Sequence, residues 1–446
     1  MSLLKYKWLT VLVLISAQAM SQQDTVHKFS VKDCVDYALK NNTKVKNALL
    51  DIEIQKQSNR VVTAGALPSI DGAGSFTDNL LIQTQLLPGE FFNQPAGTYV
   101  PVKFGTQYFA SGSVTLQQTL FDGQVFVGLQ ARKTSIDYRQ KAVLLTQDII
   151  RANIYKIYYQ LVVSKTQIEQ IDANIARAQN LLHVNTEMYK NGFAEKLEVN
   201  RSEVQLANLQ TEKLTALTNI ANGYYGLKFL MGMPEKDSLA LTDTVTDDQL
   251  KQGLLNEGVY DYNNRSDYQF YQSLNRLNEY NVKRYKLSYY PTLKLTGNFS
   301  RIGQGNELNV LGNGQWFNSA YVGLTLSVPI FSGFSKNANV KEAQLQLQQS
   351  QNTLNNLKDS IDNAVLQAVN NYHSAIATLD YQKKNVTLAE EVYNQSQKKY
   401  ESGIGSTLDI SNAEADLRVA QSNYVSAMYD AVIAQIDYLY ATGQLK

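Results

Sequence analysis

Tyr189-Lys190-Asn191-Gly192, followed by Leu197-Glu198-Val199, recurs 211 residues later as Tyr400-Glu401-Ser402-Gly403, followed by Leu408-Asp409-Ile410. Gly232 and Gly443 are related by the same offset. A constant offset over this length predicts two tandem copies of one structural unit. We place the copies at residues 22–232 and 251–446, with a linker at 233–250.

Each copy contains a long stretch without proline, at residues 123–190 and 333–402. At 1.5 Å per residue such a stretch predicts a helix of ~100 Å. Apolar residues recur mainly at spacings of three and four, with one seven-residue gap in the first stretch, which is typical of a coiled-coil seam. The seam positions are Ile150, Ile154, Ile157, Leu161, Ile168, Ile171, Ile175, Ala178 and Leu182, and then Leu354, Leu357, Ile361, Val365, Ala368, Tyr372, Ile376 and Leu379. We expect return helices at 197–230 and 408–440.

Shorter elements precede each long helix. We expect helices at Val31–Ala64 and Leu250–Leu287, the first opened by a capping pair of Ser30 and Asp33. Strands are expected at residues 68–79, 110–121, 291–301 and 320–331, each weakly marked by alternating apolar residues. The clearest strand places Val322, Leu324, Leu326 and Val328 on one face. Four strands are too few for a barrel, since the smallest have about eight, so closure requires several copies.

The first 21 residues predict a secretory signal: Lys5 and Lys7 precede an apolar run from Trp8 to Ile15. With 41 basic and 40 acidic residues, the chain is near neutral and has no basic footprint for nucleic acid. The sole cysteine, Cys34, is interpreted as a small core residue.

No enzyme chemistry is indicated. His27, His183 and His373 are isolated from other metal-ligating residues, and the glycines form no phosphate-binding or dinucleotide fingerprint. We therefore predict no catalytic residue, no cofactor and no metal site.

The ordered repeat, with Leu67-Pro68-Ser69 before the first strand and Phe121-Asp122-Gly123 and Phe331-Ser332-Gly333 before the long helices, resembles the TolC-like outer-membrane factors. The resemblance covers essentially the whole processed chain. It implies a mainly α fold with a small β portion, in which three protomers form a helical coiled-coil tunnel and one twelve-stranded transmembrane β-barrel. Residues 80–109 and 302–319 would be extracellular loops, and 233–250 an equatorial belt.

The same resemblance implies a homotrimeric channel that spans the outer membrane and the periplasm, in contact with outer-membrane lipid. It would be the passive exit duct of a tripartite efflux or type I secretion system. A periplasmic adaptor and, through it, an inner-membrane pump are the implied partners. The pattern does not distinguish drug, metal and polypeptide cargo.

Site residues are assigned at the two glycine turns, which would be the periplasmic tips. Asp409 matches the first gate aspartate of the family, Asn412 stands where its best-known member has a second, and Glu198 is the equivalent of Asp409 in the first copy. Three copies of Asp409 around an axis would favour cations. The alternative is that Asp409 stabilises the start of its helix.

Gly192 and Gly403 provide the backbone freedom of a tight turn. With Leu197 and Leu408 they are also the predicted adaptor-contacting tips.

Two other functions fit parts of the pattern. A periplasmic adaptor carries one helical hairpin between compact β-rich domains, whereas this chain has two repeats with paired strands. A structural coiled-coil protein would need neither a secretion signal nor four alternating strands.

Overall fold

A computed structural model describes residues 26–251 and 260–445. The predicted signal segment, residues 1–21, lies outside the described residues. The chain divides into two compact units: one holds residues up to 51, 139–272 and 353 onward, and the other holds 52–138 and 273–352. Each unit contains parts of both sequence repeats, so the compact units cut across the repeats.

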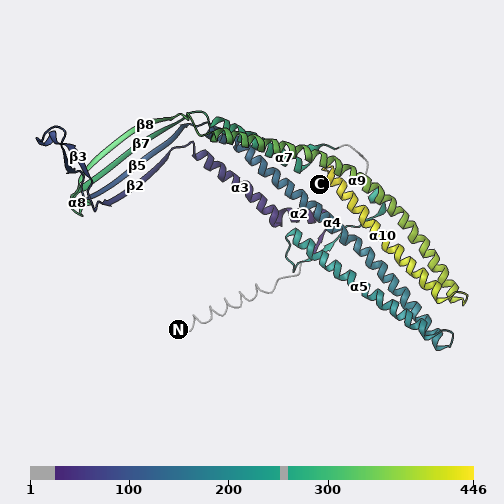
Figure 1. Ribbon diagram of the computed structural model, residues 1–446. Coiled ribbons are helices and arrows are strands. Elements are labelled where there is room, and N and C mark those ends of the chain that lie inside the picture. Colours follow the sequence, from purple (N-terminus) through teal and green to yellow (C-terminus); the bar gives the residue numbers. More distant parts are fainter. Residues whose placement is uncertain (1–25, 252–259, 446) are drawn as a thin grey trace, which may run out of the picture. The chain divides into compact units, whose positions relative to one another are not determined.

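The first unit is helical (Figure 1). Its main helices are α2 (Val31–Asn41), α4 (Gly123–Lys190), α5 (Lys196–Met231), α9 (Ser335–Glu401) and α10 (Thr407–Ala441), of which α4 and α9 begin in the second unit. Helix α5 returns along α4, and α10 returns along α9 (Figure 1). Within residues 26–251 and 260–445, no helix is both long enough and apolar enough to cross a bilayer.

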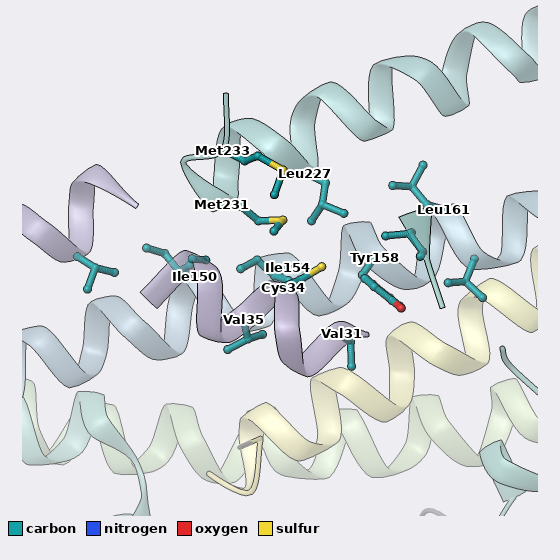
Figure 2. Close-up of a cluster of buried hydrophobic side chains, with 14 residues drawn as sticks. Val31, Cys34, Val35, Ile150, Ile154, Tyr158, Leu161, Leu227, Met231 and Met233 are labelled. Atoms are coloured by element: carbon teal, nitrogen blue, oxygen red, sulfur yellow. The ribbon is translucent and has the colours of Figure 1, made fainter. Parts of the chain in front are cut away.

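Most of the predicted seam positions lie in the core of this unit. Ile150, Ile154, Leu161, Ile171 and Ala178 of α4 are buried, as are Ile361, Val365, Ala368, Tyr372 and Leu379 of α9. Figure 2 shows one cluster, in which Ile154 and Tyr158 of α4 lie against Cys34 of α2 and Met231 of α5. Cys34 is fully buried, as predicted for a core residue.

The predicted helix Val31–Ala64 is wrong, because the chain forms two helices, α2 and α3 (Thr43–Ala64), separated by Asn42. Asn42 has extended backbone angles, and its side-chain oxygen accepts a hydrogen bond of 2.7 Å from the Lys44 amide. It thereby caps α3. The predicted capping pair at the start of α2 is confirmed as a reciprocal capping box between Ser30 and Asp33.

The predicted helix Leu250–Leu287 also differs from the structure. Helix α6 covers Asp247–Lys251, a short 3-10 turn η3 covers Tyr262–Asn264, and α7 begins only at Ser266 and ends at Leu287. Residues 252–259 lie outside the described residues. Arg265 lies between η3 and α7 with extended backbone angles. Its guanidinium donates to the carbonyls of Tyr440 and Ala441 at 3.3 and 2.9 Å, which satisfies carbonyls at the end of α10.

The linker at 233–250 contains a strand that the sequence did not suggest. Strand β6 (Ser238–Leu241) pairs in parallel with β1 (Val26–Phe29). Farther along, Asp247 forms an ion pair of 2.5 Å with Lys383 of α9 and accepts a hydrogen bond of 3.1 Å from Tyr424 of α10. The linker thus fastens elements of the first repeat to helices of the second.

The second unit contains an antiparallel sheet with the order β2-β5-β7-β8 (Figure 1). Its strands are β2 (Ser69–Asp78), β5 (Tyr108–Phe121), β7 (Thr292–Gly305) and β8 (Gln315–Ser327). The predicted strand at 320–331 is wrong at its end, because Pro329 cannot donate a ladder hydrogen bond. The predicted loop at 302–319 is too long: the strands continue, and only residues 306–314 connect them, with a one-turn helix α8 (Val310–Asn313).

The predicted loop at 80–109 has structure of its own. It contains an antiparallel hairpin of β3 (Thr84–Pro88) and β4 (Tyr99–Lys103), with a 3-10 turn η2 (Gly89–Phe92) between them.

Candidate functional site: the two interhelical turns and the two-faced sheet

The two interhelical turns have the same backbone structure. The Phe193 amide donates to the Met188 carbonyl at 2.8 Å, and the Ile404 amide donates to the Lys399 carbonyl at 3.0 Å. Gly192 and Gly403 have φ values of +79° and +74°, and a Cβ atom at either position would meet no other atom within 4 Å. Glycine is therefore required by the backbone conformation of this helix-ending motif and not by crowding.

Apolar side chains project from both turns. Leu197 is 50% exposed and Leu408 is 61% exposed. The sequence analysis missed Phe193 and Ile404, which directly follow the two glycines and are even more exposed, at 80% and 83%. Their common offset of 211 residues was the available signal.

Asp409 is held by the first turn of α10. Its Oδ2 accepts hydrogen bonds from the Ser406 amide at 3.2 Å and from Ser406 Oγ at 2.8 Å, and its own amide donates to Ser406 Oγ. These bonds from the Ser406 side chain and backbone lower the pKa of the exposed Asp409 carboxyl. The geometry supports the helix-start role of Asp409 directly, while its role as a gate stays a prediction.

Two further polar residues continue from Asp409 along α10. Asn412 is exposed three residues later, and Asp416 is exposed seven residues later. Spacings of three and four place all three side chains on one stripe of the helix. The sequence analysis missed Asp416, although the heptad spacing from Asp409 was visible.

Glu198 is a different kind of residue from its counterpart Asp409. Its side chain is 20% exposed and forms an ion pair of 3.0 Å with Arg201. Helix α5 also lacks a side-chain cap, since its preceding residue, Glu195, accepts no capping hydrogen bond.

A chain of hydrogen bonds crosses all four helices beside the turns. Thr407 of α10 donates to the Tyr400 hydroxyl of α9 at 3.3 Å, and that hydroxyl donates to Asn185 Oδ1 of α4. Asn185 Nδ2 donates to Ser202 Oγ of α5 at 2.8 Å, and Ser202 donates to the Glu198 carbonyl at 3.1 Å. Asn185, Ser202 and Tyr400 are buried, so this connection is shielded from water. Sequence reasoning did not identify it.

Glu414 is a buried carboxyl one turn beyond Asp409 on α10. Burial raises its pKa above the ordinary value, against the opposite effects of the Gln205 side chain and of the Arg177 and Arg418 guanidinium groups. Tyr393 of α9 completes the surroundings, with its ring 5.6 Å from the Arg177 guanidinium.

The sheet of the second unit has one apolar and one mostly polar face. Residues directly opposite in the strand register share a face. The apolar face carries aliphatic, aromatic and glycine residues in four aligned strands: Ile70, Gly72, Gly74 and Phe76; Ala110, Gly112, Val114 and Leu116; Leu293, Leu295, Gly297 and Phe299; and Ala320, Val322, Leu324 and Leu326.

Hydroxyl and amide side chains gather on the other face. Ser75 and Ser111 lie 2.7 Å apart there, and Asn298 donates to Thr115 Oγ1 at 2.8 Å. The apolar face is open: Val322 is 78% exposed in the single chain. Strands β2 and β8 form the two edges of the sheet.

Catalytic features are not apparent in the part of the chain that the structure describes. No group of three or more His, Cys, Asp or Glu side chains there could hold a metal ion. The pKa of the Cys34 thiol is raised to about 12, chiefly by burial, so the thiol stays protonated and unreactive.

Known proteins resemble this chain along most of its length. The pattern of the family described as "Outer membrane efflux protein" matches residues 275–444. The outer membrane protein TolC of Salmonella enteritidis is 22% identical over 349 residues, which cover 75% of this chain and 69% of that protein. The proteases secretion protein PrtF of Dickeya chrysanthemi is 21% identical over 443 residues, 96% of this chain and 89% of PrtF.

A solved structure shares the fold. The outer membrane protein VceC of Vibrio cholerae superimposes with a TM-score of 0.74 at 16% identity, covering 93% of this chain and 96% of VceC. The predicted fold class, long helices with a small four-stranded sheet, is thereby confirmed.

Proposed function

We propose that this chain, whose residues 275–444 match the outer membrane efflux protein family and which resembles TolC and PrtF, is the outer-membrane exit duct of a tripartite efflux or type I secretion system. The observation that carries the proposal is the two-faced sheet. In a soluble protein an apolar sheet face is packed against other elements, whereas this one is open over all four strands. Lipid is the natural cover for such a face.

The proposed duct is built from three copies. Strand β8 of one copy would pair with β2 of the next, because the edges of the sheet otherwise leave unpaired backbone donors and acceptors. Twelve strands exceed the roughly eight of the smallest bacterial barrels. The polar face would line the lumen, and the apolar face would contact outer-membrane lipid.

The helices would form the periplasmic part of the duct. At 1.5 Å per residue, the 68 residues of α4 span ~100 Å. Transport would be passive, without enzymatic activity in this chain, and driven by an inner-membrane pump.

The gate is proposed at the stripe that begins with Asp409. Three copies would bring Asp409, Asn412 and the added candidate Asp416 around one axis, where acidic rings favour cations. Crowding of like charges raises carboxyl pKa values. The Ser406 hydrogen bonds lower the pKa of Asp409 and so would help it to remain ionised in such a ring. Glu198 is the weaker candidate, because Arg201 already neutralises it.

Adaptor contact is proposed at the ends of the two turns. Gly192 and Gly403 shape the turns, and Leu197, Leu408, Phe193 and Ile404 present exposed apolar side chains that a helical hairpin could cover. An adaptor or a purely structural coiled-coil protein is the alternative function, but neither accounts for the open apolar sheet.

Channel recording tests both the proposed duct and the proposed gate at Asp409. We would purify the protein from outer membranes, determine its oligomeric mass and measure single-channel conductance in a planar bilayer. Asp409→Ala and Asp409→Asn are expected to raise conductance or to reduce cation selectivity. Asp33→Ala is the matched control, because Asp33 makes the same capping box at the start of α2.

The outcomes distinguish the duct from the gate. A trimeric channel that ignores both Asp409 substitutions would retain the duct and reject Asp409 as its constriction. A soluble monomer without channel activity would reject the duct itself.

A further inference from the structure

The apolar face of the sheet carries one cation, Arg301 of β7. The register places it in a row with Gly74, Gly112 and Asn318, at the end of the sheet where the connections at 79–107 and 306–314 lie. The opposite end of the sheet leads into the helices. A cation on a face that is otherwise mostly aliphatic, aromatic or glycine needs a physical explanation.

Arg301 is fixed by an aromatic platform. Its guanidinium carbon lies 5.1 Å from the ring centre of Trp316, on the neighbouring strand β8. Trp316 lies opposite Gly303, and a Cβ atom at Gly303 would come within 2.8 to 2.9 Å of three indole atoms. The indole therefore rests directly on the glycine backbone, and the guanidinium stacks on the indole.

The guanidinium has capacity for a further partner. Among the described residues, Arg301 has no carboxylate partner. The acid on the same face, Asp78, belongs to the edge strand β2, two rows farther out, and already accepts a hydrogen bond of 3.3 Å from Gln107. Gly74 and Gly112 leave the sheet beside Arg301 without side chains, so a headgroup could approach it closely.

The position of Arg301 along the sheet is consistent with a location at the membrane surface. Eight residues separate it from Leu293 along β7. At ~3.3 Å per residue this is ~26 Å of strand, or ~20 Å of height at a tilt of ~40°. Outward apolar bands of membrane barrels are ~25 Å tall and end in aromatic girdles, so Arg301 and Trp316 would lie near the outer end of the band, where the long Arg301 side chain can reach lipid phosphates.

We propose that Arg301, held on the indole of Trp316, binds the phosphate group of an outer-leaflet lipid. The proposal rests on the exit-duct function, since it needs the apolar face to meet lipid. A planar guanidinium with several N–H donors matches phosphate oxygens in charge and geometry. The site would fix the depth of the sheet in the membrane and retain a phosphorylated lipid at each protomer.

Trp316 supplies the reporter for the test. The chain has two tryptophans, Trp8 and Trp316, and Trp8 lies in the predicted signal segment, so the processed protein retains Trp316 alone. The purified trimer in mild detergent is titrated with mixed micelles that contain a bis-phosphorylated lipid A or the same lipid without its phosphates. The emission of Trp316 is followed.

We expect the phosphorylated lipid to bind at least roughly tenfold more tightly, the range of a charge-assisted contact. Arg301→Gln should abolish this preference, and Arg301→Lys should retain part of it. Gly303→Ala should weaken the preference with Arg301 intact, because the added methyl group displaces the indole. Lys294→Gln is the matched control, since Lys294 lies on the polar face of the same strand, and it should behave as the parent.

The other outcomes would reject the Arg301 site, its lipid ligand or the proposed function. An inserted trimer whose lipid preference survives Arg301→Gln would overturn the site and leave the duct intact. Complete competition by inorganic phosphate at equal concentration would identify a free-anion site and overturn the lipid source. A chain that neither trimerises nor inserts would overturn the proposed function and this site with it.

Discussion

The two interhelical turns share a backbone but differ in what surrounds it. Gly192 and Gly403 occupy equivalent positions, yet Tyr189 before the first turn is exposed, whereas Tyr400 before the second is buried and hydrogen-bonded. Helix α10 starts with a capping box, while α5 starts without a side-chain cap. The two turns thus have the same backbone conformation but connect helices that differ in capping and burial.

The return helices of the two repeats also differ in burial. In the single chain, fourteen residues of α10 are buried and six of α5, although the helices are nearly equal in length. The second repeat therefore provides the packed partner within a protomer. In the proposed trimeric duct, the more open face of α5 would be available for contacts between protomers or with an adaptor. Substitutions at equivalent positions of the two repeats can break or sharpen this comparison.

The largest difference is expected at Leu417 and its equivalent Leu206. Leu417 is 1% exposed and Leu206 is only half-buried. Leu417→Ala should lower the free energy of unfolding by ~2–5 kcal/mol, through lost burial and a cavity. Leu206→Ala should cost about half as much or less. Denaturant unfolding at one fixed protein concentration would measure both, and equal losses would contradict the division between the repeats.

A smaller difference is expected between Tyr400 and Tyr189. Tyr400→Phe removes the hydroxyl that joins Thr407 to Asn185 and leaves the Asn185 oxygen buried without its donor, at a cost of ~1–3 kcal/mol. Tyr189→Phe should change stability little. Hydrogen exchange of the amides near both turns would show where the loss falls. Unchanged protection at Asn185 in Tyr400→Phe would argue against the hydrogen-bonded connection.

The smallest effect is a pH dependence at Glu414, whose equivalent in the first repeat is the exposed Glu203. Burial raises the pKa of Glu414, so the folded chain binds its proton more tightly than the unfolded chain does. The resulting stabilisation is complete below the ordinary carboxyl pKa and is lost as the pH rises through the raised folded value.

Glu414→Gln should therefore raise the melting temperature at pH 7 by a few degrees, and the gain should shrink as the pH is lowered. Glu203→Gln should show neither effect. A gain that is constant from pH 4 to pH 8 would mean that Glu414 does not titrate in this range.

Sequence reasoning correctly predicted the features that are specified by residues close together in the chain. The proline-free stretches, the glycines at φ above +70° and the pair of Ser30 and Asp33 are each specified by a few neighbouring residues. It failed where one residue at a junction changes the path, as at Asn42, which ends α2 and caps α3. It also missed the pairing of β1 with β6, because 212 residues separate the two strands.

By itself, then, the sequence determined the repeat, the long helices and the glycine turns, since periodicity and backbone preference act within a few residues. Only the tertiary structure decided that Tyr400 joins four helices, that Glu414 is buried while Glu203 is exposed, and that Arg301 stacks on Trp316 above Gly303. These features depend on register and packing between distant segments. Two copies of one pattern can therefore share a backbone and still differ in the burial and hydrogen-bond partners of equivalent side chains.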